Sequence, residues 1–189
     1  MKLNELTLKE SIDALDKKEV SLEEIYQDLD QAYQAKNKDL NIYLSIDADA
    51  LKKAQKNKAK ALRGLPIAVK DNFCTKELPT TASSKVLDGF MPQYESTVTK
   101  RLKDNGGIIY GKTNMDAWAH GSSTETSDYG RTLNPRNPKH LPGGSSGGSA
   151  AAIAADLAIS AIGSETAGSI RQPSAWCGAV GLKDRKSVV

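Results

Sequence analysis

A glycine and serine cluster at residues 143–149 constrains this chain most. The cluster reads Gly-Gly-Ser-Ser-Gly-Gly-Ser and is followed at once by an apolar, alanine-rich run at residues 150–157. A flexible linker is not normally followed directly by such a helix-forming run. Glycines also let the backbone approach itself or a ligand closely. We therefore expect a structured loop that leads into a buried helix and presents serine hydroxyls for chemistry.

Apolar runs and amphipathic segments alternate in the middle of the chain. Residues 65–69 and 107–110 predict two buried strands, and residues 96–105 between them predict a helix that ends at Gly106. This alternation favours a layered α/β fold with functional loops at the strand ends. The chain has 189 residues, which is long enough for one such domain.

The N-terminal region, residues 1–61, is expected to be mainly helical. Two capping-box patterns predict helix starts: Thr7 with Glu10, and Ser21 with Glu24. Periodicity then predicts three elements: a helix over residues 22–35, a short strand over 40–46 and a lysine-rich helix over 48–61.

Composition says more about the cellular environment of the protein than about its function. The chain has 26 Lys and Arg against 23 Asp and Glu, a net charge of +3 that is too small to argue nucleic-acid binding. Cys74 and Cys177 are isolated thiols, and the N-terminus lacks the apolar core of a signal peptide. We expect a soluble protein in a reducing, cytoplasmic setting. Trp176 and Cys177 lie in an apolar stretch and are expected in the core.

A serine nucleophile needs a base. His120 and His140 lie in polar loops and are interpreted as ordinary surface residues. Lys70 follows the apolar run at residues 65–69, and a lysine can act as a base when burial lowers its pKa. Taken alone, the local sequence favours a strand-end lysine that reaches solvent.

The glycine cluster also invites comparison with phosphate-binding loops. A Walker-type loop needs Lys followed by Ser or Thr after its last glycine, whereas Gly148 is followed by Ser149 and Ala150. The glycine spacing of a dinucleotide site is absent as well. These differences argue against nucleotide binding.

Four segments of the chain occur in the order found in the amidase signature family. They are residues 64–72, 111–116, 121–125 and 142–152. The chain resembles that family over nearly its whole length, which implies an α/β fold with a mixed β-sheet flanked by helices. The family is usually well over twice as long, so residues 1–183 are expected to be the N-terminal part of a single domain with an incomplete fold. Residues 64–183 would form its catalytic core.

The resemblance assigns site residues by their match to the family's motifs. Lys70 is similar to the family's base, Ser145 to a bridging serine after a cis peptide bond, and Ser169 to the acylated nucleophile. Ser146 is expected to support the loop. The oxyanion hole would use backbone N–H groups, those of Thr166, Ala167, Gly168 and Ser169. The candidate pocket residues are Trp118, His120, Gly121 and Ser122.

Three positions in this set depart from the family's pattern. Ala167 stands where the family commonly has glycine, and a β-carbon there is costly if the backbone requires a positive φ. Trp118 and His120 also differ from the residues most often found in the family's amidotransferase branch, which bears on the substrate.

That amidotransferase branch implies a specific reaction and specific partners. Glutamine would donate ammonia to amidate Glu-tRNA(Gln) or Asp-tRNA(Asn) in a complex with B and C subunits. ATP, magnesium and most tRNA contacts would belong to the partner, so this chain is expected to need no cofactor and no metal. Two alternatives stay open: a stand-alone carboxamide amidase, and a non-catalytic binding or assembly module.

The last six residues, 184–189, interrupt the resemblance. One reading frame of a common sequencing adapter encodes them followed by a stop codon, so we interpret them as a non-native tail; a real basic tail is the alternative. On the first interpretation the chain lacks strands of the sheet, leaves an edge unpaired, and is inactive and prone to aggregation.

Overall fold

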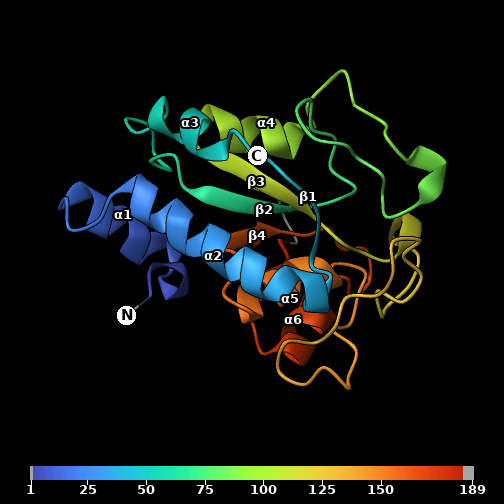
Figure 1. The fold of residues 1–189 in the computed structure, drawn as a ribbon. Coiled ribbons are helices and arrows are strands. Elements are labelled where there is room, and N and C mark those ends of the chain that lie inside the picture. Colours follow the sequence, from blue (N-terminus) through green and yellow to red (C-terminus); the bar gives the residue numbers. More distant parts are fainter. Residues whose placement is uncertain (1, 185–189) are drawn as a thin grey trace.

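A four-stranded mixed sheet forms the centre of the protein. The computed structural model describes residues 2–184, and the sheet order is β1-β3-β2-β4 (Figure 1). The strands are β1 (Tyr43–Ile46), β2 (Pro66–Lys70), β3 (Ile108–Thr113) and β4 (Ser160–Ile162). β2 runs parallel to both β3 and β4, whereas β1 is antiparallel to β3. The predicted α/β fold with a mixed, helix-flanked sheet is confirmed.

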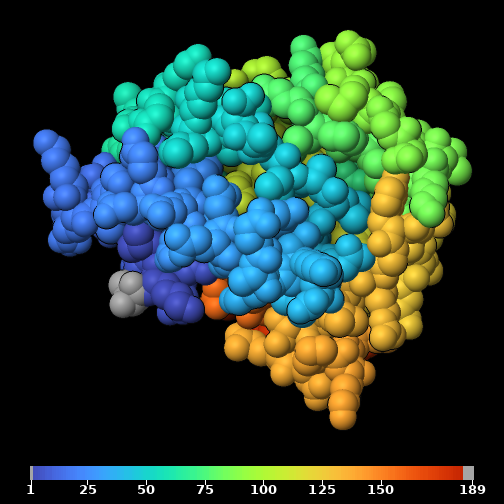
Figure 2. All heavy atoms as spheres, in the orientation of Figure 1, coloured from blue at the N-terminus to red at the C-terminus, as the bar shows by residue number. Residues whose placement is uncertain are grey.

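Helices cover both faces of the sheet. They are α1 (Leu8–Asp16), α2 (Leu22–Leu40), α3 (Ala50–Gln55), α4 (Thr97–Asp104), α5 (Gly147–Ala154) and α6 (Arg171–Cys177), with short 3-10 turns at Leu3–Glu5, Lys85–Leu87 and Ala117–Ala119. Ile67, Val69 and Ile109 pack beside Leu102 of α4 on one face. Ala68 and Tyr110 face the other side, where α2 and α5 cover them. Figure 2 shows the N-terminal region in blue beside the green and orange segments on one face of the molecule.

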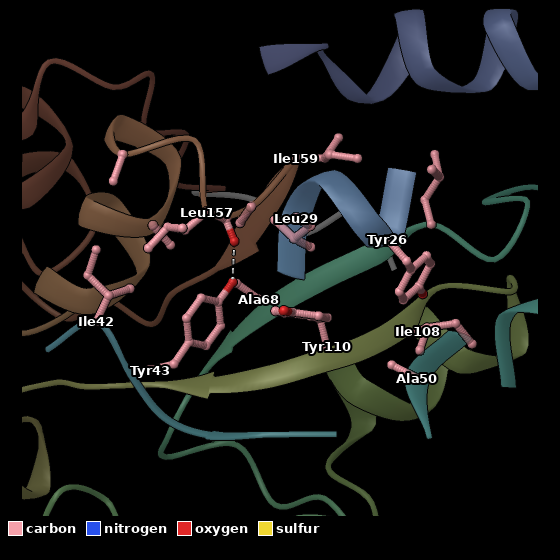
Figure 3. Packing of buried hydrophobic residues seen from close by; sticks show 14 of the residues in the cluster. Tyr26, Leu29, Ile42, Tyr43, Ala50, Ala68, Ile108, Tyr110, Leu157 and Ile159 are labelled. Carbon is pink, nitrogen blue, oxygen red and sulfur yellow. Dashed lines mark hydrogen bonds between the residues drawn. The ribbon is translucent and has the colours of Figure 1, made fainter. Parts of the chain in front are cut away.

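Three tyrosines, one each from α2, β1 and β3, pack together in the larger core (Figure 3). The ring of Tyr110 makes edge contacts with the rings of Tyr26 and Tyr43 at centroid distances of 6.4 and 5.6 Å. The hydroxyl of Tyr26 donates to Gly64 O at 2.9 Å, and that of Tyr43 donates to Leu157 O at 2.7 Å. Buried hydroxyls therefore find acceptors while their rings fill the core.

Local signals predicted the helix starts well. Both capping boxes are present, at Thr7 with Glu10 and at Ser21 with Glu24. Ser96 caps α4, and Gly106 follows that helix with φ +86°. Predictions that depend only on short-range hydrogen bonding and on glycine's conformational freedom are thus confirmed.

Helix lengths depended on packing that the periodicity did not reveal. α2 continues to Leu40 and ends where Asn41 adopts a left-handed conformation, instead of ending near residue 35. α3 ends at Gln55 instead of continuing to residue 61, because residues 56–60 are largely exposed and bury no apolar face. β4 and α6 had not been predicted.

Two further expectations can be compared with the structure. Cys177 is fully buried, as expected, but the prediction of a core position for Trp176 is wrong, since it is 50% exposed. Of the proposed tail at 184–189, only Asp184 lies within the described residues. Across residues 2–184, no helix combines the length and apolar character needed to span a membrane.

Candidate active site

Lys70 lies at the carboxyl end of the central strand β2 and has no exposed surface. Its Nζ donates hydrogen bonds to Ser145 Oγ at 2.6 Å and to Ser164 O at 3.2 Å. Burial lowers the pKa of Lys70 to about 7, while the charge of Asp116 opposes that shift. The solvent-reaching alternative is therefore wrong, and a large neutral fraction is available near neutral pH.

Ser145 lies in the glycine and serine loop that leads into α5. It is fully buried and follows a cis Gly144–Ser145 peptide bond, and its carbonyl accepts a hydrogen bond from Asp116 N at 3.2 Å. The glycines pack against other segments: a β-carbon at Gly144 would overlap Asp116 Oδ2, and one at Gly147 would overlap Thr124 Oγ1. Close approach therefore explains why this loop contains glycine.

Ser146 connects this loop to the one that carries Ser169. Its backbone N donates to Ser169 O at 3.0 Å, and its Oγ donates to Ser164 O at 3.1 Å. Ser164 N donates back to Ser146 Oγ at 3.3 Å. These three bonds fix the two loops against each other.

Ser169 is half-buried and directly precedes the first turn of α6. Within residues 2–184, no hydrogen bond joins its hydroxyl to Ser145. The structure thus brings Lys70 and Ser145 into direct contact and holds Ser169 on the adjoining loop, through its carbonyl and Ser146.

The loop before Ser169 presents unused backbone donors. In the described part of the chain, none of the N–H groups of Thr166, Ala167, Gly168 and Ser169 donates a hydrogen bond to the protein. Ala167 is not among the residues with positive φ, so its β-carbon carries no backbone strain. A preorganised set of free donors on one loop is what a developing oxyanion requires.

Glu165 holds the far side of this loop, and sequence reasoning missed it. Its side chain is 1% exposed, it accepts hydrogen bonds from the backbone N of Ile170 and Arg171 at 2.9 and 3.0 Å, and it pairs with the Arg171 guanidinium. Hydrogen bonding to Arg171 lowers the pKa of Glu165 to about 2. A Glu and an Arg six positions apart form no periodic pattern, so only the folded loop reveals the pair.

A second buried lysine, Lys112, lies on the opposite face of the sheet. Its Nζ is 3.1 Å from Asp71 Oδ1 and donates to Thr80 Oγ1 at 2.8 Å. Burial lowers the pKa of Lys112, and Asp71 opposes the shift. Lys112 thus has a carboxylate partner in direct contact, whereas Lys70 donates its hydrogen bonds to the neutral oxygens of Ser145 and Ser164.

Comparison with known proteins agrees with this geometry. A profile of the family named Amidase matches residues 24–189. The chain belongs to the amidase family.

Individual relatives agree with that membership. The A subunit of glutamyl-tRNA(Gln) amidotransferase from Agathobacter rectalis is 49% identical over 192 residues, covering 97% of this chain and 38% of the relative. Among solved structures, the same subunit from Thermotoga maritima superposes with a TM-score of 0.80 at 34% identity, over 93% of this chain and 37% of its own. The native peptide amidase from Stenotrophomonas maltophilia gives 0.81 at 33% identity, over 89% and 38%. This amidase chain therefore spans about two fifths of the length of these relatives.

The predicted pocket residues of the amidase chain lie on one exposed segment. Trp118 is 48% exposed, and His120, Gly121 and Ser122 are exposed as well. Trp118 has φ 58°, and its N donates to Ala82 O at 3.0 Å. Gly121 and Ser122 lie beside the loop that carries Ser145: a β-carbon at Gly121 would be 2.7 Å from Asp116 Oδ1, and one at Gly144 would be 3.1 Å from the carbonyl carbon of Ser122. The segment thus borders the site through Asp116, which sequence reasoning also missed. Residues 2–184 hold no group of His, Cys, Asp or Glu arranged to bind a metal ion.

Proposed function

We propose that this chain carries the catalytic machinery of an amidase, with Lys70, Ser145 and Ser169 acting as a triad. The observation that supports it most is the buried Lys70, whose pKa is lowered to about 7 and whose Nζ lies 2.6 Å from Ser145 Oγ. A neutral amine in contact with a buried hydroxyl is a base positioned to move a proton.

The reaction would proceed through an acyl-enzyme. Neutral Lys70 accepts the proton of Ser145 Oγ as Ser145 takes the proton of Ser169 Oγ, which attacks the carboxamide carbon. The oxyanion that forms accepts hydrogen bonds from the free N–H groups of the 166–169 loop. When the C–N bond breaks, the relay returns the proton to the leaving nitrogen and ammonia departs. Water then attacks the ester by the same relay and releases the carboxylic acid and Ser169.

In this scheme Ser146 would take no part in proton transfer and would only position the loop that carries Ser169. Its bonds to Ser164 and to the carbonyl of Ser169 hold the serine-bearing loop beside the relay. The catalytic step also needs the hydroxyl of Ser169 to approach that of Ser145 when substrate is bound. Positioning of this kind accounts for a large part of enzymatic rate enhancement.

For the substrate, we propose glutamine as the ammonia donor, in a complex that amidates Glu-tRNA(Gln) or Asp-tRNA(Asn). The 49% identity with an amidotransferase A subunit supports this choice. B and C subunits would complete the complex, with ATP, magnesium and tRNA handled mainly by the partner. The residues at 118–122 would border the acyl pocket. The chemistry needs no cofactor in this chain.

A stand-alone amidase is the second candidate. It is favoured by the similarity to a peptide amidase, at 33% identity and a TM-score of 0.81. Product analysis separates the two: ammonia release from glutamine that depends on partner subunits supports the first, and turnover of simple amides without partners supports the second.

A fluorophosphonate probe tests the triad itself. In the complete enzyme we expect Ser169 to be labelled, Ser169→Ala to abolish the label, and Lys70→Met and Ser145→Ala each to slow labelling by about 100-fold or more. Ser45→Ala is the control, because Ser45 lies on the edge strand β1, which pairs with β3 and not with the strand of Lys70. Equal labelling of Ser169→Ala and the wild type would overturn the proposal.

A further inference from the structure

Asp116 lies between the loop that carries Ser145 and the segment at residues 121–126. It follows β3 by a short segment, is fully buried, and accepts hydrogen bonds from Thr124 N at 2.8 Å and Ser123 N at 3.1 Å. Thr126 Oγ1 donates to it as well, at 3.0 Å. A single carboxylate thus holds residues 123–126, the segment that continues from the candidate pocket residues.

The same residue touches the catalytic loop. Its backbone N donates to Ser145 O at 3.2 Å. Its carboxylate lies so close to Gly144 that any side chain there would overlap Oδ2, and a β-carbon at Gly121 would lie 2.7 Å from Oδ1. Asp116 is therefore packed between the loop that presents Ser145 and the segment that borders the pocket.

We propose that Asp116 is a positioning residue that couples the Lys70–Ser145 relay to the pocket-bordering segment at 121–126. This inference rests on the proposed amidase chemistry and deepens it. Its carboxylate would stabilise the charged form of the lysine during proton transfer, while its hydrogen bonds seat the segment that receives the substrate. Binding in the pocket and proton affinity of the base would then depend on one group.

The charges around Lys70 favour this assignment. Asp116 is the charged residue whose field acts on Lys70 against the effect of burial. Asp71 follows Lys70 in sequence but pairs with Lys112 on the opposite face of the sheet. Glu165, next to Ser164, is engaged by Arg171 and by Lys183 at 3.4 Å. From β3, Thr113 faces the same side as Lys70 and bonds to Ser149, and neither group is charged.

The test is an NMR titration of the full chain that follows the Lys70 side chain and does not depend on turnover. Lys70→Arg assigns its Cε signal. We expect a wild-type midpoint near pH 7 and, in Asp116→Asn, a midpoint lower by about one pH unit, because an opposite charge has been removed. The matched control is Asp128→Asn, whose carboxylate accepts from Ser84 Oγ and Lys85 N, and it should leave the midpoint unchanged.

A second measurement needs no substitution and so covers the case in which Asp116→Asn fails to fold. In the wild type, the amide signal of Thr124 should shift with the same midpoint as Lys70, because Asp116 links the two groups. The amide of Lys85, bound to Asp128, should not. If the Thr124 amide signal does not shift over the pH range in which Lys70 titrates, the proposed coupling is wrong.

The outcomes distinguish a failure of this inference from a failure of the proposed amidase function. If the wild-type lysine keeps its charge above pH 9, the proposed base is wrong. If it titrates near pH 7 but its midpoint is the same in Asp116→Asn, only the role of Asp116 is wrong. In the complete enzyme, Asp116→Asn should also move the acid limb of the acylation rate to lower pH, whereas a merely structural defect would lower the rate at all pH values.

Discussion

Lys70 should reduce the stability of the fold at neutral pH, and replacing it should relieve that cost. Its pKa is lowered from 10.5 to about 7 by burial. The unfolded chain therefore binds more protons than the folded one between these two values, so the stability contribution is fully present above pH 10.5 and is lost as pH falls toward 7. At 1.36 kcal/mol per pH unit, the neutral-pH penalty is on the order of 4 kcal/mol.

Lys70→Met removes this penalty but also removes two hydrogen bonds. It leaves the buried Ser145 Oγ without the lysine as donor, whereas Ser164 O keeps Ser146 Oγ as a donor. An acceptor that loses its partner costs about 1–3 kcal/mol. We therefore expect the variant, though inactive, to be about 2 kcal/mol more stable than the wild type at pH 7. The advantage should shrink by about 2 kcal/mol between pH 7 and pH 9, as the wild type gains stability.

Urea unfolding of both proteins at half-unit intervals of pH measures this directly. Taking the difference between the two cancels the contributions of other groups whose pKa differs between the folded and unfolded chain, including Lys112 and Cys177. A difference that stays constant between pH 7 and pH 9 would refute the reasoning, since it would mean that folding does not change the proton affinity of Lys70.

Three further outcomes follow from local geometry. Gly144→Ala should abolish probe labelling, because a β-carbon would overlap a buried carboxylate oxygen, whereas Gly168→Ala should keep the fold, because its nearest neighbour would be 3.9 Å away; circular dichroism checks folding in both. Glu165→Gln should slow labelling. The wild type should lose stability as pH falls from about 4.5 toward 2, because protonation of the Glu165 carboxylate ends its pairing, and the variant should lose less; acid unfolding curves of both proteins measure this. Iodoacetamide should modify Cys74 well before Cys177 in a mass-spectrometric time course, because Cys177 is fully buried and burial raises its pKa to about 11; equal rates would contradict the packing.

Features governed by short stretches of chain could be predicted from sequence. The strand that ends at Lys70, the glycine loop before α5 and the caps at Ser21 and Ser96 all follow from patterns within a few residues. The class of fold followed in turn, because alternating strands and helices have few ways to pack.

Features governed by distant contacts could not be predicted in this way. Lys70 is buried because a loop 75 residues later in the chain covers it, whereas the local sequence favoured an exposed lysine. Asp116 receives its donors from Ser123 and Thr124 only after the chain turns back on itself. The length of α3 likewise depends on whether residues 56–60 find an apolar surface, which they do not.

The position of β2 between β3 and β4 has a consequence for how the site tolerates change. A strand with neighbours on both sides exchanges its amide protons only in the larger openings of the sheet, so Lys70 should be among the last groups to lose its place. Ser169 lies instead on a loop before the short helix α6, outside the sheet. Substitutions around the proposed nucleophile would thus alter substrate choice over evolutionary time while the proposed base stays where it is.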